Sequence, residues 1–137
     1  LRNAEFVRYG VMHRNTFLDS PRLLDATYAL KAEPRIRFAG QMTGVEGYIE
    51  STASGWTAGV AAAMEVLGKP MPQLDRFTAV GALASYISDH TVTKFQPMNI
   101  NFGIIEPLGC KIKGKREKNA KISERALERI ESLKGEL

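Results

Sequence analysis

The sequence has few of the residues that cross-link or metallate small proteins. Among its 137 residues there is one cysteine, Cys110, and there are two histidines, His13 and His90. A single thiol builds no disulfide framework, and no second cysteine or nearby histidine gives Cys110 the spacing of a metal ligand. These absences exclude a disulfide-rich secreted scaffold and a cysteine-based metal site. They favour a reducing compartment, and we expect a cytoplasmic protein without a metal.

The sequence also lacks a long hydrophobic run. It has no stretch of about eighteen apolar residues, and its first ten residues, LRNAEFVRYG, carry charges where a signal peptide needs an apolar core. Neither secretion nor membrane spanning is therefore expected. The composition, with 44% hydrophobic and 25% charged residues, is ordinary for one soluble globular unit.

The net charge of +4 is concentrated near the C-terminal end. Residues 1–110 carry 10 Lys or Arg and 10 Asp or Glu, whereas residues 111–137 carry 9 and 5. Such a cluster attracts phosphate backbones by counterion release, so it is a candidate RNA contact, and a solvated helix face is the alternative. The basic residues of this segment are Lys111, Lys113, Lys115, Arg116, Lys118 and Lys121.

Three segments have the pattern of helices. The first starts between residues 44 and 51 and ends at Gly68, since glycine commonly follows a helix end. The spacing of apolar residues predicts a second helix over about 76–90, with Asp75 as its N-cap, and a third over about 117–133.

Two short apolar runs before the first helix predict successive strands. They cover Leu23–Leu30 and Ile36–Ala39, and a turn at residues 32–34 separates them. Residues 94–110 are rich in Pro, Asn and Gly, which favours an ordered loop. The sequence thus predicts an α+β arrangement of short strands and three helices.

Glycine recurs at two kinds of position. Gly55 and Gly59 lie inside the first predicted helix, where glycine costs about 1 kcal/mol relative to alanine, so we expect close packing against a sheet or another segment. Glycines 40, 44 and 47 form GxxxGxxG, which matches neither the dinucleotide fingerprint nor the P-loop. This turn is either structural or lets a ligand approach the backbone, because a Cβ would collide with the ligand. The helix after it offers free N–H groups that suit an anion.

Three words in the sequence resemble the C-terminal third of a known family. They are EFVRYGVMHRNTF, FAGQMTGVEGYIESTASGWTAGVAAA and KFQPMNINFG, and the resemblance runs from Asn3 to about Leu133. The family is the folate- and FAD-dependent tRNA uracil-5-methyltransferase family, TrmFO or Gid. The central word is shared more loosely with the larger tRNA uridine-modifying flavoprotein GidA, or MnmG, whereas RNTF and QPMNINFG favour the methyltransferase.

The resemblance implies a bacterial cytoplasmic enzyme that forms 5-methyluridine in the T-loop of tRNA. In that family methylenetetrahydrofolate supplies the carbon, and FAD reduced by NADH or NADPH supplies reducing equivalents. The family's GxGxxG and its catalytic cysteines lie earlier in the protein, so we expect Cys110 not to be catalytic and this chain alone to be inactive.

The fold implied is the C-terminal part of a Rossmann-type, two-dinucleotide-binding FAD domain. In this interpretation residues 1–40 hold strands and a loop of the sheet, residues 41–70 hold a flavin-facing turn and helix, and residues 71–137 hold a C-terminal helical region with the basic segment. The implied partners are tRNA and the rest of the FAD domain. A homodimer would form if exposed apolar faces pair.

The resemblance also assigns a cofactor-binding set. N–H groups around residues 45–47 would stabilise the negative charge of reduced flavin. Gln41 would hydrogen-bond a ribityl hydroxyl, and Tyr48 would either stack on the ring or cap the core beneath the turn. Glu46 is expected to turn away from the flavin or to hold a basic partner. The set comprises Gly40, Gln41, Thr43, Gly44, Val45, Glu46, Gly47 and Tyr48.

Four further residues are candidates for the substrate site. Arg14 would bind folate carboxylates or a tRNA phosphate, and His13 would shuttle protons, unless each forms a structural ion pair. Asn99 and Asn101 would line the pocket or, alternatively, fix the loop through Asx turns. Two other functions stay open: a GidA-like flavoprotein of wobble-uridine modification, and a non-catalytic RNA-binding or assembly module.

Overall fold

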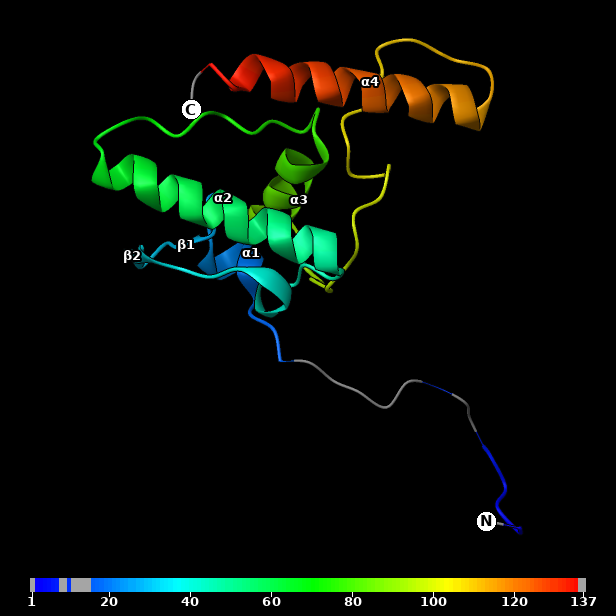
Figure 1. Cartoon of the computed structure of the whole chain (residues 1–137). Helices are drawn as coiled ribbons and strands as arrows, with labels where there is room; N and C mark the ends of the chain where they lie inside the picture. Colours follow the sequence, from blue (N-terminus) through cyan, green and yellow to red (C-terminus); the bar gives the residue numbers. More distant parts are fainter. Residues whose placement is uncertain (1, 8–9, 11–15, 136–137) are drawn as a thin grey trace.

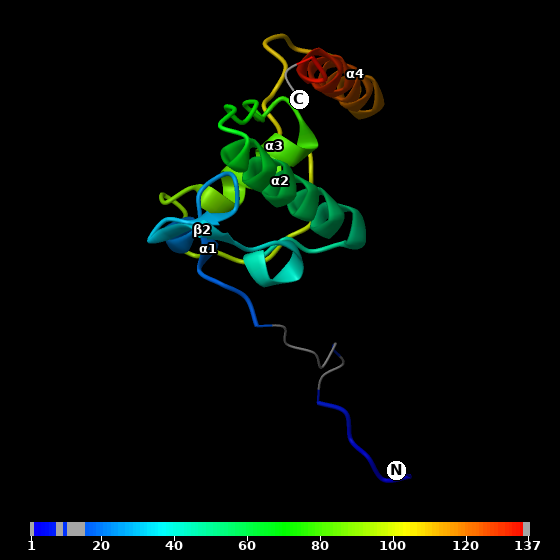
Figure 2. The ribbon, with the colours of Figure 1, turned by 60° about the vertical axis from the view of Figure 1, so that its left-hand side comes forward.

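The computed structural model describes residues 2–7, 10 and 16–135 (Figure 1). The described part is mostly helical and has one two-stranded antiparallel sheet, which confirms the α+β class. In Figure 2, as in Figure 1, α2 and α3 lie between the β1–β2 hairpin and α4. The elements are α1 Ser20–Leu23, β1 Ala29–Leu30, β2 Glu33–Arg37, the 3-10 helix η1 Gly40–Thr43, α2 Tyr48–Val66, α3 Ala79–Ser88 and α4 Lys115–Leu133.

The first predicted strand, Leu23–Leu30, is mostly a turn in the structure. Only its last two residues pair, as β1, and Leu23 ends the one-turn helix α1. The Asp25 carboxylate interrupts the run because it accepts hydrogen bonds from the N–H groups of Thr27 and Ala29. An Asp side chain that bonds its own backbone in this way favours a turn over a strand.

The second strand is shifted toward the N-terminus. It covers Glu33–Arg37 instead of Ile36–Ala39, so Pro34 lies inside β2 and not in the predicted turn. Both strands of a two-stranded sheet are edges, where the missing N–H of proline breaks no ladder.

Helix α2 confirms the first predicted helix. Its buried face carries small side chains, which let it pack closely on α3, and Gly68 follows its end with φ of 64°. Gly55 and Gly59 lie on the opposite face and are exposed, and a Cβ built on either has no atom within 4 Å. The close packing expected at these two glycines is therefore absent from the described structure. The buried residues of α2 are Ser54, Thr57, Ala58, Ala61 and Met64.

The second predicted helix, 76–90, is shorter in the structure and is capped by Thr78 instead of Asp75. The Thr78 hydroxyl accepts a hydrogen bond from the Gly81 N–H at 3.0 Å. The Asp75 carboxylate accepts one from the Phe77 N–H at 3.0 Å and so fixes the turn before α3. Asp and Thr are both favoured N-caps, which is why the sequence pattern alone selected the wrong one.

The main core lies where α2, α3 and the turn before α2 meet. Tyr28 is fully buried there with φ of 62°, and its hydroxyl has no hydrogen-bond partner in the described structure. Burial therefore raises the pKa of this hydroxyl well above its usual range. The cluster consists of Leu24, Tyr28, Val45, Ala58, Leu83, Ala84, Ile87 and Phe95.

Helix α4 is attached to the rest by few contacts. Among the apolar residues whose spacing predicted this helix, Ile122 and Leu133 are buried, whereas Leu127 is 71% exposed. Ile122 packs with Ala82 and Ile105 in a second small cluster.

Two arginines supply the polar part of the α4 attachment. The Arg129 guanidinium pairs with the Asp75 carboxylate at 2.6 Å. The Arg125 guanidinium donates to the carbonyls of Glu106 and Pro107 and lies 4.6 Å from the centre of the Phe77 ring. The Arg129–Asp75 pair is only partly buried, with side chains 29% and 26% exposed, so it contributes modestly to stability.

Candidate functional site

The three sequence words meet around Phe95. Its ring lies edge-on to Phe17 of the first word, with ring centroids 6.1 Å apart and ring planes at 66°. The same ring covers Gly44 of the second word. The Leu18 N–H, which follows the first word, donates to the Met42 carbonyl at 2.8 Å. Segments that are far apart in the sequence therefore build one site.

A parallel bridge joins the glycine turn to the loop that follows α3. The Glu46 N–H donates to the Met98 carbonyl, and the Met98 N–H donates to the Gly44 carbonyl, each at 3.1 Å. The bridge fixes the backbone immediately before α2. The loop over residues 94–110 has no helix or strand, as predicted.

Gly44 and Gly47 are required by the chain itself. Their φ values are 85° and 91°. A Cβ on Gly44 would lie 2.6 Å from Cε1 of Phe95, and one on Gly47 would lie 2.7 Å from Nδ2 of Asn99. The space that a Cβ would fill is thus occupied by the protein, so close approach of a ligand is not the reason for glycine at these two positions.

Several members of the predicted cofactor set are directed into the protein. The Gly40 N–H donates to the Ser54 hydroxyl at 2.7 Å, and the Gly40 carbonyl accepts from the Thr43 hydroxyl at 2.8 Å. Thr43 and Val45 have no exposed surface. Gln41 is exposed, and its side-chain amide makes no hydrogen bond in the described structure.

The first turn of α2 presents free N–H groups. Gly47 is the N-cap and has no side chain to accept from them, and the N–H groups of Tyr48, Ile49 and Glu50 have no acceptor among the described residues. Tyr48 is 94% exposed, so the alternative role of capping the core is wrong. The positive end of a long helix is therefore open beside an aromatic side chain.

The acidic residues next to this turn differ in their contacts. The Glu50 carboxylate accepts from the Ile100 N–H at 3.2 Å and from the Asn99 amide at 3.5 Å. Glu46 is half-buried and forms no ion pair in the described part of the chain, so the basic partner considered for it is absent there. Glu50 belongs to a sequence word that carries the resemblance, but its spacing did not indicate this contact.

The remaining substrate candidates fall into two groups. Asn101 accepts from the Gly103 N–H at 2.9 Å, which is the loop-fixing Asx turn given as its alternative. His13 and Arg14 lie outside the described residues, so their predicted roles stay predictions.

All six Lys and Arg residues of the basic segment are exposed. None of its six Lys and Arg side chains forms an ion pair in the described structure, and Cys110 beside it is exposed and free. The next turns of α4 expose Glu124, Glu128 and Glu131 on the side opposite the buried Ile122. On α4 a polyanion would therefore meet unpaired positive charge mainly in the first two turns and the loop before them.

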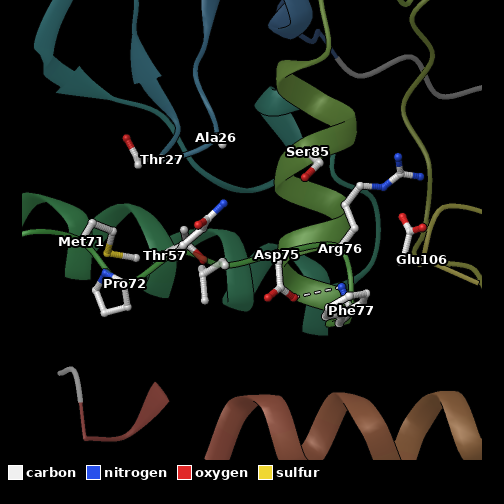
Figure 3. A pocket seen from close by; sticks show the side chains of 12 residues that line it. Ala26, Thr27, Thr57, Met71, Pro72, Asp75, Arg76, Phe77, Ser85 and Glu106 are labelled. Atoms are coloured by element: carbon white, nitrogen blue, oxygen red, sulfur yellow. Dashed lines mark hydrogen bonds between the residues drawn. The ribbon is translucent and has the colours of Figure 1, made fainter. Parts of the chain in front are cut away.

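A cavity of about 590 Å³ lies beside the middle of α2 (Figure 3). Arg76 and Glu106 line one side of it with Ser85, and Thr57 and Met71 line the other. None of the residues predicted to bind a ligand lines this cavity. No motif in the sequence indicated it.

The part of the chain that the structure describes has neither a cluster of metal ligands nor a membrane-spanning helix. It contains no group of three or more His, Cys, Asp or Glu side chains arranged to hold a metal ion. Its helices are all too short or too polar to cross a bilayer.

Comparison with known proteins gives one family match and many close relatives. A model of the family described as GIDA, glucose inhibited division protein A, matches residues 1–70. The relatives are named methylenetetrahydrofolate--tRNA-(uracil-5-)-methyltransferase TrmFO. The one from Acetivibrio thermocellus is 60% identical over 127 residues, which is 93% of this chain and 29% of the relative.

Two further relatives of the same name match over nearly all of the chain. The protein from Listeria monocytogenes serovar 1/2a is 53% identical over 137 residues, which is 100% of this chain and 32% of the relative. The Bacillus subtilis (strain 168) protein is 52% identical over 133 residues, 97% of this chain and 31% of the relative. The chain thus spans about a third or less of the length of the curated relatives it matches.

Proposed function

Because the chain belongs to the GIDA family, we propose that it is part of a folate- and FAD-dependent tRNA uracil-5-methyltransferase. Its relatives at 51–60% identity carry that activity in their names. The observation that carries the proposal is the convergence of the three sequence words at the open end of α2. In this proposal the protein forms 5-methyluridine in the T-loop of tRNA in the bacterial cytoplasm.

The residues at the start of α2 fit the flavin that this family implies. The N–H groups of Tyr48, Ile49 and Glu50 have no acceptor among the described residues, and the N-cap Gly47 has no side chain to supply one. When bound, FAD supplies reducing equivalents, which NADH or NADPH restores. In the proposal these N–H groups stabilise the negative charge of the reduced ring, Tyr48 stacks on it, and Gln41 contacts the ribityl chain.

The other assigned residues have supporting roles in this proposal. Gly40, Thr43, Gly44, Val45 and Gly47 shape the turn, since their side-chain positions and most of their polar groups are used within the chain. Methylenetetrahydrofolate and the uracil would approach on the side of the Asn99–Asn101 segment and of His13 and Arg14.

The partner proposed for the outward face of α2 is the rest of the FAD domain, including its GxGxxG and its cysteines. Apart from Glu65, which pairs with Arg37 at 2.6 Å, the exposed residues of α2 carry no charge. An uncharged face that includes Ile49 and Trp56 is typical of an interface. Without that partner the same face would pair two copies. When the rest of the FAD domain is present, residues 1–40 and 41–70 would complete that domain, and residues 71–137 would form its C-terminal helical region.

The proposed activity is tested with the full-length gene. Its deletion is expected to remove 5-methyluridine from tRNA, and the purified full-length protein is expected to be yellow with a flavin absorption band. Nucleoside analysis measures the first result and absorbance the second. Loss of a wobble-uridine side chain would instead favour the GidA-like activity. Colourless protein that binds tRNA with a steep salt dependence would favour a non-catalytic module.

The basic segment is expected to contact tRNA phosphates. Replacing Lys113, Lys115 and Lys118 by alanine in the full-length protein should lower the slope of log affinity against log salt concentration by about 3, one for each lost contact. Filter binding at several salt concentrations measures this slope. The matched control is Lys94→Ala, an exposed lysine outside the segment, and an equal effect of both changes would contradict the assignment.

A further inference from the structure

One contact of Glu50 spans the site and is not explained by helix formation. Its carboxylate reaches fifty residues along the chain, to the Ile100 N–H at 3.2 Å and the Asn99 side-chain amide at 3.5 Å. Two donors on one oxygen hold the loop against the first turn of α2. The contact lies beside the Val45–Met98 bridge, so loop and helix are joined by backbone and side chain together.

The direction of this carboxylate is unusual for its position. Glu50 is the third residue of α2, where an acid ordinarily turns toward the free N–H groups of its own helix. Here it makes no such bond and instead lies over Gly47, where a Cβ would meet it at less than 3.0 Å. Glycine at position 47 therefore makes room for the carboxylate, which accepts its hydrogen bonds from the loop and none from the N–H groups of α2.

We propose that Glu50 is a positioning residue, which holds the Asn99–Ile100 segment on the first turn of α2 and keeps those N–H groups free for the flavin. This inference rests on the proposed function, because it presumes that a flavin binds there. Glu50 acts through hydrogen bonds to the loop and does not touch the reacting atoms. Its negative charge nevertheless stays close enough to the helix end to influence the reduced, anionic flavin.

Two substitutions in the full-length protein separate the hydrogen bond from the charge. Glu50→Gln keeps an oxygen for the Ile100 N–H, so flavin affinity should stay within about twofold of the wild type while the reduction potential rises, since a negative charge is removed. Glu50→Ala removes the acceptor and should weaken flavin binding about tenfold, as expected for a lost hydrogen bond to a charged group. Flavin titration and redox titration measure the two effects.

Glu65→Gln is the matched control, because it neutralises another acid of α2 that pairs with Arg37 on the hairpin. It should change neither affinity nor potential. The inference is overturned if the flavin reduction potential of Glu50→Gln equals that of Glu65→Gln and Glu50→Ala binds flavin as tightly as the wild type does. The proposed function would still stand after that result. A wild type that binds no flavin would overturn the proposed function itself.

Discussion

Replacing Gly81 by alanine is expected to destabilise the chain by about 2–4 kcal/mol, although alanine is the better helix former. A Cβ on Gly81 would lie 2.7 Å from the carbonyl carbons of Leu74 and Asp75, and closer still to the Asp75 carbonyl oxygen. Backbone atoms cannot rotate away as a side chain can, so the start of α3 has to shift. The shift would also lengthen the hydrogen bond from the Gly81 N–H to the Thr78 cap.

Urea unfolding followed by circular dichroism measures this loss. The control is Gly59→Ala, which also replaces a helical glycine but points a Cβ into open space. That change should stabilise the chain by about 0.5–1 kcal/mol, because only the higher intrinsic helix propensity of alanine acts there. Equal stability of the two variants would show that α3 does not begin against the Leu74–Asp75 backbone.

Replacing Gly44 by alanine is expected to cost about 3 kcal/mol, from two independent sources. The φ of 85° is strained for any residue with a Cβ. In addition, the new Cβ would lie 2.6 Å from Cε1 of Phe95. The Phe95 ring is buried and contacts the rings of Phe17 and Tyr86, with centroids 6.1 and 5.5 Å away, so it has little room to move.

A double-mutant cycle separates these two sources. Phe95→Leu costs stability by itself, but in the Gly44→Ala background it should cost about 1 kcal/mol less, because the smaller side chain relieves the collision. The strain from φ remains in both backgrounds. Additive losses in urea unfolding would contradict the contact between the two residues.

The parts of the fold that were predicted well depend on local patterns. The bounds of α2 follow from a glycine turn before it and Gly68 after it, and residues 94–110 are a loop because Pro, Asn and Gly recur there. The errors arose where two local signals compete. Asp25 lies inside an apolar run and turns it, and Asp75 and Thr78 are both suitable caps for α3.

The site shows a different limit of sequence reasoning. The resemblance selected the words that meet at α2, but periodicity and spacing carry no information about which residues touch across fifty positions. The packing of Phe95 on Gly44, and the hydrogen bond from Ile100 to Glu50, depend on the path of the loop after α3. For the same reason the exposure of Tyr48 could not be derived from its neighbours in the sequence.

The sparse attachment of α4 implies that this helix unfolds separately from the part of the described structure that contains α2 and α3. Only Ile122 and Leu133 are buried along this helix, whereas α2 and α3 share the main core. Amide protons of α4 should therefore exchange with solvent through local openings that leave the rest folded. Since the basic residues lie on the same helix, it could reorient on a polyanion without disturbing the turn before α2.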